Sequence, residues 1–437
     1  MKTKIEQEKI GLLGLGIENL ALLNFLQKKY KKIDITICDT RSTKEIEKNI
    51  PEIKKLKNIK WQTGKKLNEN LEKYSILFRS PGWPLNCPGI KKASKNGVII
   101  SSPMNFFFQI SPSKNIIGVT GTKGKGTTAT LIYEIIKNSG KKCFLGGNIG
   151  IAPFNFLNKI KKNDWIVLEL SSFQLEDLNY SPPIAVITNL FEEHLKPADP
   201  HNPNFHSSLN NYFQAKINIA RKQNEKDFLV INKKLKNKVK LKLKGKKIYF
   251  SKSKTASKLV GDFNQENISA AEKVAEILKI KKGIVQKTIK NFSNLNHRLE
   301  LVKVLEERTF YDNSFSTTPE STILDLQSFK GNIILIAGGA DKGSDFKKLA
   351  QTIKNKTKFL ILLPGIGTEK IKKELKKVKY PPTKVMAVDT MATAVKKAWE
   401  KSAKRDIILL STACASFGLF KNYKERGDLF QKEVKKI

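Results

Sequence analysis

Residues 116–130 read IIGVTGTKGKGTTAT, an apolar strand pattern followed by a turn of glycine and lysine and then by a helix pattern. Glycines allow backbone N–H groups to close around an anion, and the helix N-terminus that follows adds partial positive charge. Lys125 supplies a full positive charge for a phosphoryl group. The common phosphate-loop pattern has Gly where this chain has Val119, and Ser or Thr where it has Gly126. The loop alone therefore does not separate a nucleotide site from an ordinary glycine turn.

Two companion motifs follow the loop in order and favour the nucleotide site. GNIG spans residues 147–150, and LELSSFQLE spans residues 168–176. Ligands of parallel α/β sheets bind beyond the carboxyl ends of the strands, where Glu169 and His194 are both expected. Helix patterns alternate here with strand patterns at residues 115–119, 165–169, 185–189 and 228–232. Residues 114–296 are therefore predicted to form a central P-loop ATPase-like domain with a parallel sheet.

The segments on either side repeat the alternation of strands and helices. In the first, Gly11, Gly14 and Gly16 are close to a dinucleotide fingerprint, although Asn19 replaces its last glycine. In the last, NIILIAGGADKG, FLILLPG, KVMAVD and DIILLSTACAS read as strands that end in glycine or polar turns. A chain of 437 residues is too long for one core. We predict an α/β protein of three domains: Rossmann-like residues 1–113, central residues 114–296 and Rossmann-like residues 297–437.

No apolar run approaches the roughly 18 residues of a membrane helix. The apolar run at residues 10–17 lacks a small-residue cleavage site and continues into Glu18, so it predicts a first strand and not a signal peptide. The four cysteines are dispersed, which favours reduced thiols in a cytoplasm over a disulfide framework. We expect a cytoplasmic protein with no membrane partner.

The net charge of +41 raises nucleic-acid binding as an alternative function. Only seven of the 81 basic residues are arginine, and the lysines are scattered through every segment. A nucleic-acid site usually shows a basic cluster or stripe with stacking aromatic residues. The densest basic run, residues 236–247, alternates lysine with apolar residues as a solvated edge strand does. No specific nucleic-acid partner is predicted, and a basic P-loop ATPase acting on nucleic acid stays the alternative from another class.

With these motifs the chain resembles the Mur ligases, ATP-dependent enzymes that add amino acids to the peptidoglycan precursor. The resemblance runs from GLLGLGIENL at residues 11–20 to STACASFGLFKNYKERG at residues 411–427. The latter stretch and GGADKGSDF at residues 338–346 are most similar to the D-glutamate-adding branch. The resemblance implies ATP and Mg²⁺ as cofactors, UDP-N-acetylmuramoyl-L-alanine and D-glutamate as partners, and a monomer that forms an amide through an acyl phosphate.

The resemblance also implies the residues of each site. The UDP-substrate site contains Gly14, Leu15, Gly16, Ile17, Asp39, Thr40, Arg41, Ser80, Pro81, Gly82 and Asn148. The ATP site contains Gly121, Thr122, Lys123, Gly124, Lys125, Gly126, Thr127, Thr128, Asn264, Asn267, Arg298 and Asp312. The incoming amino acid meets Thr317, Lys342, Ser416 and Tyr423. The catalytic set is Lys125, Glu169, His194, Lys216 and Arg298, and the metal ligands are Thr127, Glu169, His194 and a carbamylated Lys216.

Chemistry supports several of these implied roles. A carboxylate at the end of a strand is a hard oxygen ligand suited to Mg²⁺, although a helix-capping role for Glu169 is the alternative. A lysine carbamate is likewise an anionic oxygen ligand, whereas the alternative for Lys216 is an ordinary surface lysine. Arg298 offers a fork of donors to phosphate oxygens when the domains close. His201 and His206 are expected to be structural.

Two departures from the family pattern bear on the chemistry. Gly126 removes the hydroxyl that usually follows the loop lysine, and Thr127 is the nearest replacement. Many D-glutamate-adding relatives have Asp-Ser-Lys where residues 313–315 read Asn-Ser-Phe, so Phe315 removes a cation and Asp312 is left to replace the acid. Two further alternatives therefore stay open: another Mur ligase or a folylpolyglutamate synthase-like ligase, and a binding module without turnover.

Overall fold

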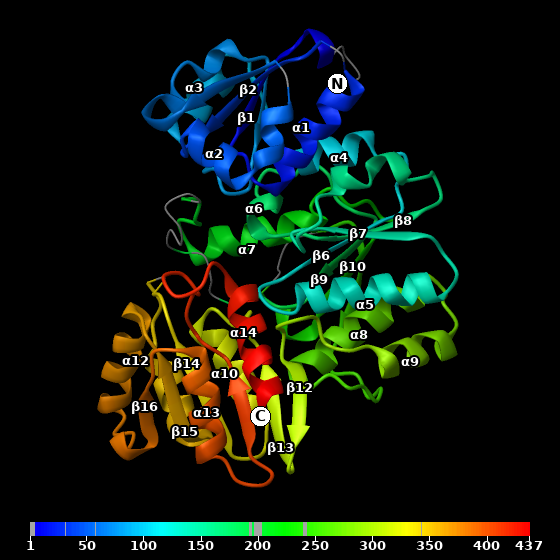
Figure 1. The fold of residues 1–437 in the computed structure, drawn as a ribbon. Helices are drawn as coiled ribbons and strands as arrows, with labels where there is room; N and C mark the ends of the chain where they lie inside the picture. Colours follow the sequence, from blue (N-terminus) through cyan, green and yellow to red (C-terminus); the bar gives the residue numbers. More distant parts are fainter. Residues whose placement is uncertain are drawn as a thin grey trace. The chain divides into compact units, whose positions relative to one another are not determined.

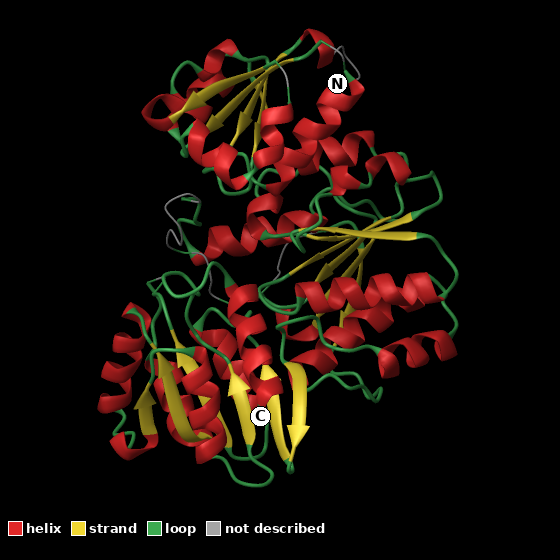
Figure 2. Cartoon of the chain, viewed as in Figure 1, coloured by secondary structure: helices red, strands yellow, loops and turns green. Residues whose placement is uncertain are grey.

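In a computed structural model of the chain, residues 5–30, 32–56, 58–191, 195, 203–238, 243–341 and 343–437 are described. They form three sheets, each flanked by helices (Figures 1 and 2). Contacts between residues divide the chain into two compact units. The first contains Met1–Ser251 and Glu266–Thr288, and the second contains Lys252–Gln265 and Ile289–Ile437.

The first sheet is parallel throughout, with strand order β3-β2-β1-β4-β5. Its strands are β1 (Lys9–Leu13), β2 (Asp34–Asp39), β3 (Ile59–Thr63), β4 (Ile76–Arg79) and β5 (Ile99–Ser101). Its helices are α1 (Ile17–Lys29), α2 (Thr43–Asn49), α3 (Pro88–Lys95) and α4 (Pro103–Ile110). The apolar run at residues 10–17 thus forms β1 and the turn into α1, as predicted.

The second sheet is also parallel, with order β11-β10-β9-β6-β8-β7. Its strands are β6 (Ile116–Thr120), β7 (Cys143–Gly147), β8 (Trp165–Glu169), β9 (Ile184–Ile187), β10 (Phe228–Asn232) and β11 (Lys246–Phe250). Its helices are α5 (Lys125–Asn138), α6 (Ser172–Leu175), α7 (Leu209–Ile217), α8 (Asp262–Ile277) and α9 (Lys282–Asn291). Helices α5, α8 and α9 lie together on one face (Figure 1). The basic run at 236–247 contributes only its last two residues to the edge strand β11.

One hydrophobic core runs through both sheets of the first unit. Phe154 is central to it. Its ring centroid lies 5.2 Å from that of Phe25 in α1, and 5.9 and 6.2 Å from those of Phe106 and Phe107 in α4. Buried aromatic side chains dominate core energetics, so this shared cluster explains why two sheets form a single compact unit.

The third sheet is mixed, because β12 (Glu300–Leu305) pairs antiparallel with β13 (Arg308–Asp312). The strand order is β12-β13-β17-β14-β15-β16, and every other neighbouring pair is parallel. The other strands are β14 (Ile333–Gly338), β15 (Thr357–Leu363), β16 (Val385–Ala387) and β17 (Ile407–Leu410). The helices are α10 (Pro319–Gln327), α11 (Lys347–Lys356), α12 (Ile366–Lys377), α13 (Met391–Lys401) and α14 (Tyr423–Lys436). Alternate residues of β14 enter two cores, one containing α10, α11 and α12 and the other containing α13 and α14.

The predicted boundary at residue 296 differs from the contact division in two segments. Residues 252–265 and 289–296, which that boundary places in the central domain, fall in the second unit. For residues 252–265 the reason is packing, since Val260 and Phe263 lie against the core of α10, α11 and α12. No described helix is both long and apolar enough to cross a membrane.

Candidate active site

The turn between β6 and α5 has its carbonyl groups held by hydrogen bonds from protein donors. Gly121 O accepts from Lys216 Nζ at 2.8 Å, Thr122 O from Lys125 Nζ at 3.0 Å, and Lys123 O from Thr188 Oγ1 at 2.7 Å and Asn189 Nδ2 at 3.0 Å. The first N–H groups of an α-helix have no intrahelical partner. Within the turn, the N–H groups of Thr122 and Lys123 donate to Asn189, at 3.0 Å to its backbone O and at 2.8 Å to its Oδ1. The first N–H groups of α5, which begins directly after the turn, are therefore the donors that suit an anion such as phosphate.

Gly124 allows a second helix to approach the loop. Its φ is +80°, and a Cβ atom here would overlap the side chain of Asn267 in α8. Asn267 is buried and belongs to the first unit, so this predicted ATP residue does lie against the phosphate loop. Asn264 belongs to the second unit, where its Nδ2 donates to Val260 O at 2.8 Å.

Glu169 and Asn148 form a second corner beside β6. Glu169 ends β8, the neighbour of β6, and is buried. Its Oε1 accepts from Asn148 Nδ2 at 3.2 Å, while the Asn148 N–H donates to Glu169 O at 2.8 Å. No group in the described part of the chain donates a hydrogen bond to its buried Oε2. A buried carboxylate oxygen without a donor is costly unless a cation completes it, so the site suits a hard ion such as Mg²⁺.

The alternative reading of Glu169 as a helix cap is wrong. Helix α6 is capped by Ser171, whose hydroxyl accepts from the N–H of Gln174 at 3.2 Å. Gln174 Oε1 in turn accepts from the N–H of Ser171 at 2.7 Å, which completes a capping box. The carboxylate of Glu169 is therefore left for another role.

Hydroxyl groups follow the loop lysine although Gly126 has none. Thr127 is 8% exposed at the start of α5. The hydroxyls of Thr128 and Thr130 are buried, and neither has a hydrogen-bond partner among the described residues. The role of Thr127 as a metal ligand stays a prediction.

Lys216 is 2% exposed, so the alternative of an ordinary surface lysine is wrong. It lies in α7, where its ammonium is 4.7 Å from the ring centroid of Tyr212 and donates to the loop carbonyl of Gly121. The hydroxyl of Tyr212 is 3.0 Å from Thr122 Oγ1, so α7 supports the phosphate loop through two side chains. His206 stacks on Phe173 with ring centroids 4.8 Å apart, in agreement with its expected structural role. His194, His201 and Lys342 lie outside the described residues.

The predicted UDP-substrate residues of the first sheet gather at the carboxyl ends of β1, β2 and β4. Asp39 Oδ2 accepts from the N–H of Leu15 at 2.7 Å, and Asp39 Oδ1 accepts from Arg41 Nε at 2.9 Å. Arg41 Nη2 donates to Leu15 O at 3.0 Å. Burial opposes ionisation of Asp39, but the hydrogen bonds from Arg41 and Leu15 outweigh it and hold its pKa below the usual value. Asp39 and Arg41 therefore fix the β1–α1 turn. Ile17, the first residue of α1, is 62% exposed.

The remaining members of this predicted group lie in the turns that follow β1, β2 and β4. A Cβ atom on Gly14 would overlap Ser80 Oγ, so Gly14 lets the two turns meet. The carbonyls of Pro81 and Gly82 accept from Asn204 Nδ2 at 2.8 Å and from its backbone N–H at 3.2 Å. Thr40 and Gly16 are exposed.

Sequence reasoning missed Glu18 as an ionisable group of this region. It is 9% exposed in the first turn of α1, and its Oε1 accepts a short hydrogen bond from Gln174 Nε2. Its buried Oε2 has no partner among the described residues. Burial raises the pKa of Glu18 to about 7, against the lowering effects of Gln174 and of the buried Arg79. The only sequence signal was a glutamate within an otherwise apolar helix start.

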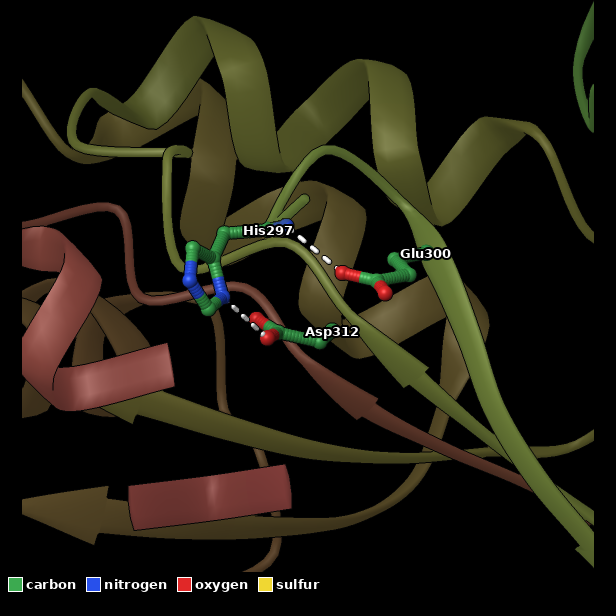
Figure 3. A group of neighbouring side chains, drawn as sticks. All are labelled: His297, Glu300 and Asp312. Carbon is green, nitrogen blue, oxygen red and sulfur yellow. Dashed lines mark hydrogen bonds and ion pairs between the residues drawn. The ribbon is translucent and has the colours of Figure 1, made fainter. Parts of the chain in front are cut away.

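In the second unit, Asp312 is fully buried and bonded to His297 (Figure 3). Asp312 Oδ2 lies 2.7 Å from His297 Nδ1, and the backbone N–H of His297 donates to Glu300 Oε2 at 2.8 Å. The hydrogen bond to Asp312 raises the pKa of His297, against the opposing effect of burial. The amide of Gln431 donates to Glu300 Oε2 and Asp312 Oδ2, each at 2.9 Å. Because that amide contacts both carboxylates, the cluster is a closed hydrogen-bond network and not an open cation site.

Two glycine- and alanine-rich motifs of the second unit come together. Ala340, within GGADKG, and Ala415, within ACAS, form a pair of backbone hydrogen bonds of 3.1 Å each. Ser416, the residue after Ala415, is buried. Tyr423 begins α14, and Thr317 lies just before α10. The sequence assigned residues of both motifs to one amino-acid site, and their backbone pairing is a finding of the structure.

The predicted phosphate contact Arg298 stacks on an aromatic ring. Its guanidinium carbon lies 3.6 Å from the ring centroid of Phe315. Phe315 in turn meets Tyr423 edge to face, with centroids 5.0 Å apart. Arg298, a predicted ATP residue, thus contacts Phe315, the residue that departs from the family pattern.

Comparison with known families covers most of the chain. The family described as Mur ligase MurD-like, N-terminal domain, matches residues 8–102; Mur ligase middle domain matches 119–297; Mur ligase, glutamate ligase domain, matches 297–414. The UDP-N-acetylmuramoylalanine–D-glutamate ligase of Acetivibrio thermocellus is 34% identical, covering 100% of this chain and 98% of the relative. That of Clostridium tetani is 35% identical, with the same coverage. The chain belongs to the Mur ligase family.

Solved Mur ligases share the fold of this one. The UDP-N-acetylmuramate–alanine ligase MurC of Thermotoga maritima is 17% identical with a TM-score of 0.58, covering 98% of this chain and 100% of that one. The MurF ligase of Thermotoga maritima in complex with ADP is 15% identical with a TM-score of 0.58, covering 99% of both chains. The predicted family and the predicted three-domain α/β fold are both confirmed.

Proposed function

We propose that this Mur ligase joins D-glutamate to the alanyl carboxylate of UDP-N-acetylmuramoyl-L-alanine, converting ATP to ADP and phosphate in peptidoglycan precursor synthesis. The observation that carries the proposal is the full-length similarity to relatives that are named for this reaction. The anion-binding turn beside the incompletely bonded Glu169 supports the ATP-dependent half of the reaction. The paired GGADKG and ACAS motifs support a shared amino-acid site in the second unit.

A carboxylate is a poor electrophile, so amide formation needs activation. Transfer of the γ-phosphoryl group to the alanyl carboxylate gives an acyl phosphate, and attack by the amine of D-glutamate releases phosphate. Lys125 is proposed to neutralise charge on the transferred group, because it begins α5 at the end of the anion-binding turn. Arg298 is proposed to contact phosphate oxygens as well. Asn148 is proposed to contact the UDP-substrate near the reacting carboxylate.

The residues present fit a magnesium ion. Glu169 Oε2 is buried and accepts no hydrogen bond from the described residues, and coordination to a divalent cation would compensate its charge. Thr127, His194 and a carbamylated Lys216 are the other proposed ligands. Lys216 supports this proposal by its burial beside the phosphate loop. Mg²⁺ bound there would neutralise negative charge on the phosphates.

The finer statements about substrates and setting also belong to the proposal. Ser416 and Tyr423 are proposed to hold the side-chain carboxylate of D-glutamate, with Lys342 and Thr317 near the same amino acid. A site with hydrogen-bonding groups for that carboxylate rejects apolar amino acids, because their binding would leave the polar groups unpaired. We expect a cytoplasmic monomer that needs no nucleic acid.

Phosphate release with ATP, Mg²⁺, UDP-N-acetylmuramoyl-L-alanine and a panel of D- and L-amino acids tests the proposal. Release should require both the UDP-sugar and D-glutamate. Lys125→Ala should abolish it, whereas Lys137→Ala, at the exposed far end of the same helix, should not. Equal turnover with L-lysine or diaminopimelate would contradict the D-glutamate assignment. Stimulation by DNA or RNA without the UDP-sugar would instead favour a nucleic-acid ATPase.

A further inference from the structure

The guanidinium of Arg298 is paired with the aromatic ring of Phe315. The guanidinium carbon lies 3.6 Å from the centroid of Phe315, a distance typical of face-on stacking. Phe315 is 37% exposed, so its ring is not simply a member of the core. A lysine at this position would repel the guanidinium, whereas the face of a phenyl ring attracts it.

The backbone at Phe315 is held by several hydrogen bonds. The N–H of Phe315 donates to His297 O at 3.1 Å, which ties this backbone to the residue before Arg298. Its neighbour Ser314 donates from Oγ to Tyr423 O at 2.7 Å. The buried Arg426 donates to Ser314 Oγ at 3.0 Å and to Ser314 O at 2.8 Å. These bonds fix the backbone at Phe315, and the ring of Tyr423 packs against its ring.

The backbone of Arg298 is fixed from its other side. His297 adopts a left-handed backbone conformation with φ of +60°, which is strained for a residue with a side chain. Its ring is bonded to Asp312 Oδ2 at 2.7 Å and its N–H to Glu300 Oε2 at 2.8 Å (Figure 3). A Cβ atom on Gly427 would overlap that ring, so α14 also closes around it. The hydrogen-bond network around His297 thus fixes the backbone next to Arg298, and the ring of Phe315 fixes the position of the Arg298 guanidinium.

We propose that Phe315 is a positioning residue for the ligase reaction, and that its ring presets the Arg298 guanidinium for the phosphates of ATP. This inference rests on the proposed function, because it assumes that Arg298 contacts ATP. It assigns Phe315 a role that the aromatic ring performs and that an aliphatic side chain of similar size does not. The Asp312–His297 pair supports the same geometry from the backbone side.

Phe315→Leu and Phe315→Tyr separate stacking from packing. A cation–π contact contributes about 1 to 2 kcal/mol, which corresponds to roughly 5- to 30-fold in rate. Phe315→Leu should therefore lower kcat/KM for ATP by roughly 5- to 30-fold. Phe315→Tyr keeps the ring and should stay within about threefold of the wild type. Equal losses in the two variants, or no loss in Phe315→Leu, would overturn the proposal.

A double-mutant cycle with Arg298→Met, which removes the cation, gives the decisive measurement. If the ring acts through the guanidinium, Phe315→Leu should cost much less in the Arg298→Met background than alone. Additive losses would overturn the proposal, as they would show that Phe315 acts on something else. Thermal unfolding of each variant confirms that the protein compared is folded. The same assay tests the proposed function separately. If the wild-type protein showed no D-glutamate-dependent phosphate release, the proposed function itself would be refuted.

Discussion

Replacement of Glu18 by glutamine should change how stability depends on pH. The native pKa of Glu18 is about 7, against 4.5 for the free side chain, chiefly because burial penalises the charged form. Between these two values the native state keeps a proton that the unfolded chain has lost, so the free energy of unfolding falls as pH rises. The stabilisation is complete below pH 4.5 and lost above about pH 7.

The size of this effect follows from the same shift. Each pKa unit corresponds to about 1.4 kcal/mol, so the shift is worth on the order of 3 kcal/mol. Glu18→Gln does not titrate. The unfolding free energy of the variant relative to the wild type should therefore rise by on the order of 3 kcal/mol between pH 4.5 and pH 8. Any packing cost of the amide is the same at both pH values and cancels in this comparison.

Urea unfolding followed by tryptophan fluorescence measures the change, because Trp61, Trp83 and Trp165 all lie in the first unit with Glu18. Glu52→Gln, a change at an exposed position of the same unit, is the matched control and should show no such trend. A relative stability that changes by less than about 1 kcal/mol over this range would refute the reasoning. So would an equal trend in the control, because it would reveal a general effect of charge.

Three further predictions concern the phosphate loop. Lys216→Ala should lose most activity, and acetate or formate should partly restore it if a carbamate normally supplies the oxygen ligand; near-normal turnover of the variant at ordinary magnesium would exclude the role. Thr127→Ala should reduce kcat much more than Thr130→Ala if Thr127 replaces the hydroxyl missing at position 126, and equal activities would show that it does not. Gly124→Ala should abolish ATP binding, measured by titration calorimetry, because the new Cβ overlaps a buried amide of α8. Gly140→Ala, at a similar φ of +82° but in open space, should bind ATP normally, and a matching loss there would point to backbone strain alone.

The amino-acid sequence alone determined those features of the fold that depend on residues close together along the chain. An apolar strand, a glycine turn and a helix start at residues 116–130 predicted the phosphate loop, and β6, the turn and α5 follow that pattern. Alternation of strands and helices predicted the parallel sheets for the same local reason. It did not predict the antiparallel β12, because a strand pattern has no direction until it finds a partner.

Tertiary structure alone decided burial and long-range pairing. In a chain with 81 basic residues, composition favoured a surface position for Lys216, yet packing buries it on a carbonyl 95 residues away in sequence. The ring under Arg298 and the raised pKa of Glu18 likewise depend on neighbours that folding supplies. Local sequence sets backbone conformation through sterics and periodicity, whereas desolvation and contact between distant residues exist only in the packed chain.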